Sequence, residues 1–384
     1  MSVARFKVCV MQHRLLHYRT DLFDRLRLAC SNAGIELLLV HGHATAAESS
    51  RKDTGTLPWA LPVNSRSVRI AGKDILWQPL PAQARDSDLV VLMQENRLVS
   101  NYPWLFGWRR PATRVAFWGH GRNFQTSAPS GWRERWKRWT LTKVDWWFAY
   151  TDLARQAVLQ VGYPAARVTV LNNAIDNTRF EGELAAIGDD VVAALRQQIG
   201  AVPGSTVGLY CGSLYPDKRL DLLLAACERV VAQRPDFRLV VVGDGPSRDV
   251  LQRAASKPWL HWAGALRGAD KAAGFRASQL FLSPGAVGLH VLDSFVAGTP
   301  MITTTDALHG PEVAYLEHDV NGLICAGNPK DYAQTVLGLI ADPQRLERLR
   351  RSGHASASHY TLDAMVRNFT DGVLACLRQP RLPR

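Results

Sequence analysis

A single stretch near residue 290 constrains the fold of this chain more than any other feature. In order, it predicts a strand over Gln279–Leu282, a glycine-containing loop, a helix over Gly288–Ala297 and a second strand over Met301–Thr304. Two strands joined through a helix form the crossover connection that parallel sheets require. The stretch therefore indicates a βαβ unit and an α/β fold.

The same alternation of short β-branched runs and helical patterns continues through the whole chain. The other expected strands are Phe6–Met11, Ile35–Val40, Leu89–Met93, Arg114–Trp118, Trp146–Tyr150, Val207–Cys211, Arg238–Val242 and Leu260–Ala263. The expected helices are Thr20–Ala33, Asp189–Ile199, Arg219–Gln233, Ser247–Ala255 and Leu362–Leu377. This pattern is typical of α/β proteins with parallel sheets.

Length and composition indicate a globular protein of two domains. A chain of 384 residues with 47% apolar and 21% charged residues can bury two separate cores. The six cysteines show no C-x-x-C pair, which favours thiols in a reducing compartment over disulfides or zinc. The apolar run within Met1–His13 is too short for a secretion signal, and no run of about 18 apolar residues is present. We therefore expect a cytoplasmic protein.

The net charge of +12 lies entirely in the first half of the chain. Residues 1–180 contain 25 Lys and Arg against 13 Asp and Glu, whereas residues 181–384 contain 21 of each kind. The first half is thus expected to face an anionic partner.

The loop and helix of the opening stretch have the chemistry of a nucleotide site. Gly288 leaves room for a ligand to approach the backbone, and the amides that begin the helix favour an anion, phosphate above all. Asp293 follows five residues later and can accept hydrogen bonds from a sugar diol. One helix could then hold the diphosphate and the ribose of a nucleotide.

The segment Ser283–Pro300 also resembles the donor site of the retaining family 4 glycosyltransferases. That family has the GT-B fold, in which two doubly wound, Rossmann-like domains face each other across a cleft. Its usual pattern is a Glu, seven residues, a second Glu, and a small-residue helix that ends in Gly-x-Pro. Asp293 takes the second Glu position and Gly298-Thr-Pro300 the ending, but Gly285 stands where the first Glu is usual. The resemblance is strong over residues 206–340 and patchier over residues 6–180.

The resemblance implies a domain plan and a set of donor contacts. Residues 1–185 would bind the acceptor, residues 200–360 the nucleotide sugar, and residues 361–384 would form a helix that crosses back to the first domain. The segment Glu181–Ser205 is the candidate junction.

The resemblance also implies donor contacts. Lys218 matches a family lysine that binds the diphosphate. A positive charge at the start of a helix is unfavourable unless an anion binds there. The implied diphosphate contacts are Ser213, Lys218, Arg219, Gly288 and Leu289, and Asp293 is the implied ribose contact.

Backbone contacts to the sugar and the base follow from the same resemblance. Gly285 has no carboxylate to bind the sugar hydroxyls. The sugar would therefore contact Gly285 itself and the backbone amides of Ala286 and Val287. The base would meet Gly264, Ala265 and Leu266, which follow an expected strand.

The acceptor candidates and one of the two catalytic candidates lie in the first half. His120 lies between two glycines at a strand end and matches the family histidine that reaches the transferred sugar. His120 and Lys218 are therefore the catalytic candidates; for His120 the alternative is a structural role in its loop. The acceptor candidates are Arg14, His17, Arg19, Arg122 and Asn123. For Asp176 we favour a local turn role.

A basic, tryptophan-rich segment suggests a further partner. Eight of the twelve tryptophans lie within residues 101–150, with nine Lys and Arg and two acidic residues. Trp132, Trp136 and Trp139 fall on one face of an expected helix, as in helices that lie on anionic membranes. The alternative is that this face packs on the core. Nucleic acid is disfavoured because it would leave the nucleotide-like second half unexplained.

We therefore expect a glycosyltransferase that uses a UDP- or GDP-sugar and acts on an anionic or lipid-linked glycan, as in assembly of cell-envelope polysaccharides such as lipopolysaccharide. Retention of configuration is implied by the resemblance alone. No Asp-x-Asp motif is suitably placed, so we expect no metal and no cofactor beyond the sugar nucleotide.

Two alternatives remain: a GT-B-type sugar-nucleotide epimerase, and a catalytically silent sugar-nucleotide-binding subunit at the membrane. A dehydrogenase is disfavoured because the first strand is not followed by G-x-G-x-x-G.

Overall fold

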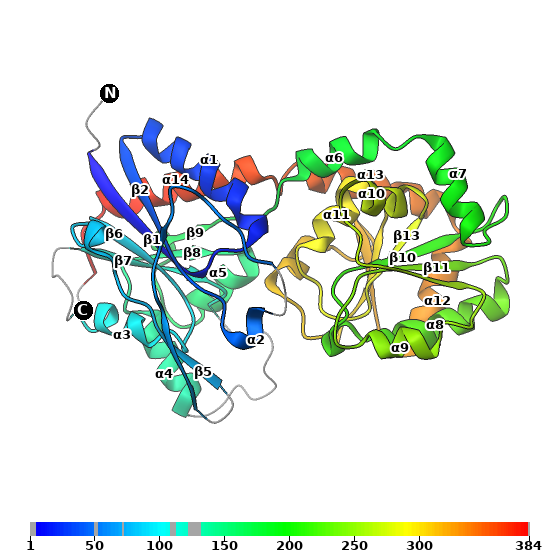
Figure 1. The fold of residues 1–384 in the computed structure, drawn as a ribbon, viewed down its shortest axis with the longest axis horizontal. Coiled ribbons are helices and arrows are strands. Elements are labelled where there is room, and N and C mark those ends of the chain that lie inside the picture. The colour runs from blue at the N-terminus through cyan, green and yellow to red at the C-terminus, as the bar shows by residue number, and fades with distance from the viewer. Residues whose placement is uncertain (1–4, 50–52, 71–72, 108–112, 122–131, 383–384) are drawn as a thin grey trace. The chain divides into compact units, whose positions relative to one another are not determined.

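The computed structural model describes residues 5–49, 53–70, 73–107, 113–121 and 132–382. The chain separates into two units (Figure 1). Unit 1 comprises residues 1–175 and 362–384, and unit 2 comprises residues 176–361. The segment 181–205, which the sequence suggests as a junction, lies inside unit 2.

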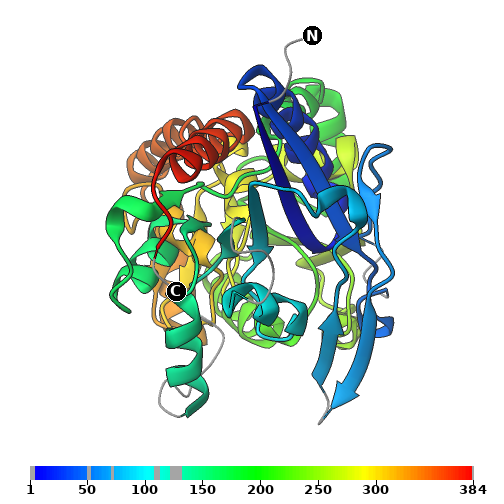
Figure 2. The same cartoon turned by 90° about the vertical axis from the view of Figure 1, so that its left-hand side faces the viewer.

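Unit 1 is built on a parallel sheet whose strand order in the described residues is β3-β2-β1-β6-β7-β8-β9. Its strands are β1 (Phe6–Arg14), β2 (Ile35–Gly42), β3 (Leu61–Pro62), β6 (Leu89–Met93), β7 (Arg114–Gly119), β8 (Trp146–Ala149) and β9 (Val168–Val170). An antiparallel hairpin of β4 (Arg66–Ile70) and β5 (Lys73–Trp77) extends beyond this sheet (Figure 2).

The helices of unit 1 come from both ends of the chain. They are α1 (Thr20–Asn32), α2 (Ala46–Ser49), α3 (Tyr102–Leu105), α4 (Trp132–Leu141), α5 (Asp152–Leu159) and α14 (Leu362–Arg378). The last helix, red in Figure 1, packs beside α1, and Arg25 donates a hydrogen bond to Asp363 over 2.8 Å. Phe369 of α14 stacks on Phe148 of β8 with ring centroids 4.5 Å apart. The C-terminal helix is thus part of the core of unit 1.

Unit 2 is a second parallel sheet, of strand order β12-β11-β10-β13-β14-β15. Its strands are β10 (Val207–Cys211), β11 (Arg238–Val242), β12 (Leu260–Gly264), β13 (Leu280–Leu282), β14 (Met301–Thr304) and β15 (Gly322–Cys325). Because β10 and β13 are parallel neighbours, the loops that follow them emerge at the same sheet edge. The candidate functional residues of unit 2 gather there.

Helices surround the sheet of unit 2. They are α6 (Asn177–Ala185), α7 (Asp189–Gln198), α8 (Leu220–Gln233), α9 (Arg248–Arg253), α10 (Gly268–Arg276), α11 (His290–Ala297), α12 (Pro329–Ile340) and α13 (Pro343–Ala357). In α8 an apolar stripe at helical spacing, including Leu220, Leu223 and Cys227, is buried against the sheet. Packing of such stripes, more than helix propensity, holds these helices in place.

The predicted α/β class is confirmed, and so is the strand-helix-strand order of residues 279–304. The strands over Val207–Cys211 and Arg238–Val242 end at the expected residues. The sequence analysis missed β3, the β4–β5 hairpin, β9 and β15. Of these, β3, β9 and β15 have two to four residues, which is too short to show a periodic pattern.

Short α2 is held to unit 1 by one buried carboxylate. Glu48 accepts hydrogen bonds from the Thr45 amide at 3.0 Å and from Arg97 at 3.0 Å, and its Oε2 lies 2.8 Å from Nε2 of His13 on β1. Burial alone would raise the pKa of Glu48, but these partners lower it from an ordinary 4.5 to about 2. The ionised carboxylate is therefore favoured by folding.

Replacement of Glu48 by Gln should destabilise the protein in a pH-dependent way. A folded pKa below the unfolded one stabilises the protein above about pH 4.5, and that stabilisation is lost as the pH falls toward 2. The variant should lose roughly 3 kcal/mol near pH 7, seen as a thermal midpoint several degrees lower, and the difference should shrink below pH 4.5.

A matched Glu36→Gln variant provides the control. Glu36 is half exposed and lies 4.0 Å from Lys7, so its replacement should change the thermal midpoint little at any pH. Equal behaviour of the two variants would contradict the role assigned to Glu48.

Candidate functional site

The loops that follow β10 and β13 are hydrogen-bonded to each other. The Ala286 amide donates to the Asp217 carbonyl at 2.9 Å, and Nζ of Lys218 donates to the Ala286 carbonyl at 2.6 Å. Lys218 also lies 3.4 Å from the Asp217 carboxylate, and its side chain is largely buried. The ammonium group is thus held in a defined position beside the segment that leads into α11.

Gly285 makes this contact possible because it has no side chain. A Cβ at this position would lie 2.3 Å from the Asp217 carbonyl oxygen and 2.4 Å from Cα of Lys218, closer than real Cβ atoms approach. The obstacle is backbone, which cannot swing aside as a flexible side chain can. The glycine that replaces the usual family Glu therefore allows the Lys218 loop to pack directly on the loop after β13.

The rest of the loop up to Val287 is also fixed by internal hydrogen bonds. Thr304 donates to the Pro284 carbonyl at 2.7 Å, and the Val287 amide donates to Nδ1 of His309 at 3.1 Å. The opposite ring nitrogen of His309 lies 2.6 Å from the Thr304 carbonyl, which sets the tautomer with the proton on Nε2. Burial lowers the pKa of His309, consistent with that neutral form.

These bonds correct one expectation about the sugar contacts. The amides of Ala286 and Val287 both have protein acceptors, and the two residues are buried. In this structure they are not free to bind a sugar. The segment 285–287 instead positions its neighbours.

At Gly288 the backbone becomes open. No heavy atom lies within 4 Å of a Cβ placed there, and in the described part of the chain no acceptor is bound to the amides of Gly288 and Leu289. Leu289 caps the start of α11, whose dipole adds positive character at this end. Burial, with the nearby cations of Lys218 and Lys271, lowers the pKa of His290 to about 3, so its imidazole is neutral. Two amides and one ammonium thus form an anion-binding arrangement.

Asp293, the expected ribose contact, has a partner that the sequence analysis missed. Its Oδ2 lies 2.9 Å from Nζ of Lys271 on α10. Burial raises the pKa of Asp293, and the Lys271 cation opposes that rise. Burial alone would lower the pKa of Lys271, yet Asp293 raises it above its ordinary value. No motif marks Lys271, because only the tertiary fold, in which α10 and α11 both pack against α6, brings it to Asp293.

Arg219 and Ser213 differ from Lys218 in their surroundings. The guanidinium of Arg219 donates to the Asp306 carboxylate at 2.8 Å, the Thr304 hydroxyl at 3.1 Å and the Gly327 carbonyl at 2.8 Å. In this structure Arg219 joins three loops and does not present its nitrogens to a ligand. Ser213 is exposed at the end of the β10 loop.

The expected base contacts lie at the same sheet edge. Gly264 ends β12 with φ of 71°, and its carbonyl accepts the Gly243 amide at 2.7 Å. Ala265 is exposed and Leu266 is half-buried. The loops after β11 and β12 are thereby linked, which puts residues 264–266 on the rim of the unit.

In unit 1, His120 follows β7 and is exposed. Its ring lies on Tyr150, with centroids 4.4 Å apart and planes 32° from parallel. Gly121 has φ of 66°, and a Cβ there would lie 2.6 Å from a Val158 methyl group. The glycine therefore lets the loop pass over α5 with the imidazole at the sheet edge.

The three expected acceptor residues near β1 have different surroundings. Arg14 forms a bidentate pair with Asp53, with 3.0 Å between Nη2 and Oδ2, so its charge is already balanced. His17 is exposed, and Nδ1 lies 3.2 Å from the Asp53 carbonyl. Arg19 is buried with its guanidinium over the rings of Trp118 and Tyr150, 5.0 and 5.4 Å from their centroids, and among the described residues its Nη1 has no hydrogen-bond partner. Arg122 and Asn123 lie outside the described residues.

The aromatic surface of α4 is partly packed and partly exposed. The Trp136 ring lies 6.1 Å from the Tyr102 ring and the Trp139 ring lies 5.6 Å from the Phe106 ring, measured between centroids. Each tryptophan is still 41% exposed. Lys143 lies 4.8 Å from the Trp139 ring centroid. The Trp132 side chain lies outside the described residues. Over the described ranges, no helix combines the length and apolarity needed to cross a membrane.

Comparison with known proteins relates unit 2 to one family. Residues 205–342 match the family model described as Glycosyl transferases group 1. A D-inositol 3-phosphate glycosyltransferase of Segniliparus rotundus is 29% identical over 198 residues, which cover 48% of this chain and 42% of the relative. A GDP-mannose-dependent alpha-(1-6)-phosphatidylinositol dimannoside mannosyltransferase of Mycobacterium tuberculosis is 32% identical over 162 residues, 40% of each chain. The chain spans about half the length of the curated relatives it matches.

Solved structures match nearly the whole chain. Anabaena HepE in complex with UDP has a TM-score of 0.68 at 16% identity, over 96% of this chain and 99% of that one. Sucrose-phosphate synthase from Thermosynechococcus elongatus has a TM-score of 0.65 at 14% identity, over 96% and 98%. The fold is GT-B. The expected fold class is confirmed.

The two glycines of the loop after β13 should respond differently to substitution. Gly285→Ala places a Cβ against the backbone of residues 217–218, so the Lys218 loop must shift and the thermal midpoint should fall by several degrees. Gly288→Ala meets open space and should leave the midpoint nearly unchanged. Differential scanning calorimetry of both variants tests this, and equal midpoints would contradict the close contact described here.

Proposed function

We propose that this chain is a retaining, family 4 glycosyltransferase that transfers a sugar from a nucleoside-diphosphate sugar to a glycan or lipid-linked glycan. The observation that carries the proposal is the anion-binding arrangement of Lys218 with the amides of Gly288 and Leu289. All three residues lie within the segment 205–342 that matches the glycosyltransferase family model. The relatives named above are glycosyltransferases.

The donor diphosphate would lie between Lys218 and the start of α11. When the bond from the sugar to the diphosphate breaks, negative charge grows on the leaving oxygen. Lys218 and the two amides would stabilise that charge. We accordingly propose a metal-independent reaction with no cofactor, in which the cation and the helix dipole take the role that a metal has elsewhere.

Asp293 remains our candidate for the ribose. Lys271 binds one carboxylate oxygen, Oδ2, and leaves the other as an acceptor for a hydroxyl pair. Lys271 would then keep the carboxylate ionised despite its burial. The base would lie near Gly264, Ala265 and Leu266. A UDP- or GDP-sugar is the proposed donor, since HepE was crystallised with UDP and the mycobacterial relative is GDP-mannose-dependent.

For the acceptor we propose an anionic group in unit 1, close to His120 and Arg19. Among the described residues, Arg19 is a buried cation with no carboxylate partner, and aromatic faces offset only part of the cost of burying it. The named acceptors of the relatives, inositol 3-phosphate and phosphatidylinositol dimannoside, carry phosphate. Equal use of a neutral acceptor and its phosphorylated form would contradict this assignment.

We further propose that the protein works in the cytoplasm at the inner face of the membrane. The six cysteines, all unpaired, suit a reducing compartment. Trp136, Trp139 and Lys143 form a half-exposed aromatic surface with a cation beside it, which suits the interface of an anionic bilayer. A membrane location fits a lipid-linked acceptor and a role in envelope polysaccharide assembly.

Replacement of Lys218 or Asp293 by Ala should weaken donor binding, whereas His120→Ala should leave it intact and reduce transfer. A bound nucleotide at 100 times its Kd should stabilise the wild type by ~2.7 kcal/mol, so a thermal-shift screen of UDP- and GDP-sugars can identify the donor. Transfer is then followed as nucleotide release with phosphorylated and lipid-linked acceptors.

Lys330→Ala serves as the matched control, because Lys330 is an exposed lysine at the start of α12, outside the site. It should bind the donor like the wild type. If no sugar nucleotide stabilises the wild type, or if Lys218→Ala and Lys330→Ala respond alike, the donor-site assignment is wrong.

The membrane proposal predicts that Trp136→Ala with Trp139→Ala reduces sedimentation with phosphatidylglycerol vesicles. Aromatic side chains at the interface and cations on anionic lipid both contribute to such binding. Phosphatidylcholine vesicles should bind the wild type less. Undiminished sedimentation of the double variant would rule out this surface.

A further inference from the structure

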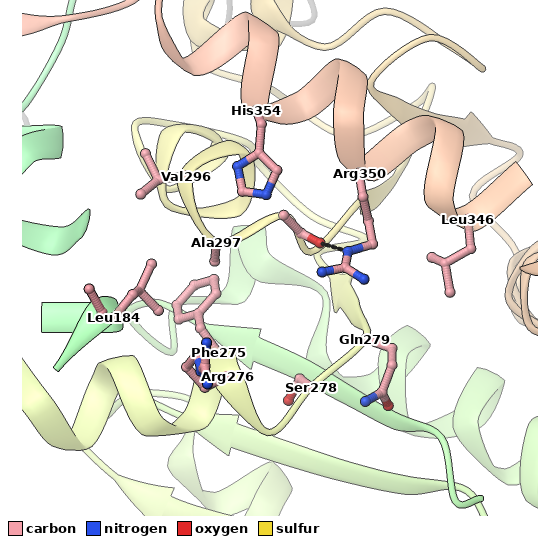
Figure 3. A pocket seen from close by; sticks show the side chains of 12 residues that line it. Leu184, Phe275, Arg276, Ser278, Gln279, Val296, Ala297, Leu346, Arg350 and His354 are labelled. Atoms are coloured by element: carbon pink, nitrogen blue, oxygen red, sulfur yellow. Dashed lines mark hydrogen bonds between the residues drawn. The ribbon is translucent and has the colours of Figure 1, made fainter. Parts of the chain in front are cut away.

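A second concave site lies in unit 2, at the sheet edge opposite the candidate donor site. It is a cavity of about 400 Å³ between the ends of α6, α10 and α11 and one face of α13 (Figure 3). Ser278 and Gln279 line it and precede β13, whereas Gly288 and Leu289 follow that strand. The cavity is therefore separate from the donor loops, although α11 extends from one site to the other.

The polar groups of this cavity are mainly hydrogen-bond donors. Arg350 donates from Nε to the Gly298 carbonyl at 3.1 Å, which fixes the guanidinium and leaves its terminal nitrogens toward the space in Figure 3. Oε1 of Gln279 already accepts the Val207 amide at 2.8 Å, so its NH₂ group remains as a donor. Arg276 and His354 add two more basic side chains, from α10 and α13.

The positive charge of the cavity is only weakly balanced. None of the twelve lining residues is acidic. Arg276 pairs at 3.1 Å with Asp189, whose side chain is 98% exposed. Arg350 lies 3.5 Å from Glu347, which makes a shorter contact of 2.8 Å with Arg351. Exposed pairs of this kind contribute little.

One wall of the cavity is apolar. It consists of Leu184, Phe275, Val296 and Leu346. A ligand that fits has an anionic head for the two guanidinium groups and a carbon body for this wall. The volume is within the range of small-molecule sites and exceeds what a bare inorganic ion needs.

We propose that this cavity binds a small phosphomonoester, such as a sugar phosphate. Arg276 and Arg350 would form charge-assisted hydrogen bonds with the phosphate, a geometry to which the planar guanidinium is suited. The Gln279 amide would donate a further hydrogen bond, and the sugar ring would lie against the apolar wall. This inference does not depend on the proposed glycosyltransferase activity.

The test is calorimetric titration of the 384-residue protein with glucose 1-phosphate and with inorganic phosphate, each with and without saturating UDP. The wild type should bind the ester in both conditions. The double variant Arg276→Gln/Arg350→Gln should bind it about tenfold or more weakly, because two charge-assisted hydrogen bonds are lost. Inorganic phosphate should bind more weakly than the ester, because it cannot use the apolar wall.

The matched control is Arg348→Gln/Arg351→Gln, which removes the same number of positive charges at exposed positions of α13 outside the cavity. It should bind within about twofold of the wild type. Arg276→Gln alone keeps the Arg350 bond to Gly298 and should weaken binding while its thermal midpoint is unchanged. The proposal is overturned if the wild type binds no ester, if UDP displaces it, or if both double variants lose equal affinity.

Discussion

The packing of residues 217–218 on Gly285 is the contact on which the candidate donor site depends. It brings two loops from neighbouring strands close enough for Lys218 to bond the Ala286 carbonyl and for the Ala286 amide to bond the Asp217 carbonyl. The Val287 amide is bound to His309, whereas the amides of Gly288 and Leu289 have no acceptor among the described residues. Donors that the fold already holds in place would need little reorganisation to bind an anion.

Charge compensation distinguishes the basic groups of the chain. Arg14, Arg97 and Arg219 each have carboxylate partners, and these residues connect loops and strands. Lys218 has only the half-exposed Asp217 at 3.4 Å, and Arg19 has aromatic faces. Arg276 and Arg350 have partners that are exposed. Within the described residues, Lys218, Arg19, Arg276 and Arg350 thus have weaker charge compensation than Arg14, Arg97 and Arg219.

Much of the fold could be predicted from the sequence because parallel strands buried on both faces appear as short β-branched runs. The strand and helix of residues 280–297 were predicted and are confirmed. Asp176, for which a local turn role was predicted, caps the start of α6 and accepts the Thr178 amide at 3.2 Å. Short β9 and β15 were not predicted, because their pairing comes from neighbouring strands and leaves no periodic signal. The partners and burial of individual side chains could not be predicted from the sequence either. Arg14 and Arg19 look alike in sequence, yet one is paired with Asp53 and the other is buried under Trp118.

By itself, the sequence determined the α/β class, the order of most strands and helices, and the glycine-rich approach to α11, since local periodicity and turn residues encode these features. Only the tertiary structure decided that Lys271 pairs with Asp293, that the amides of Ala286 and Val287 are occupied, and that Arg276 and Arg350 share a cavity. Each of these features depends on residues that are distant in sequence; Lys218 and Ala286, for example, are separated by 68 positions. Local pattern carries no information about such distances, because side-chain partners are selected by the packing of whole elements.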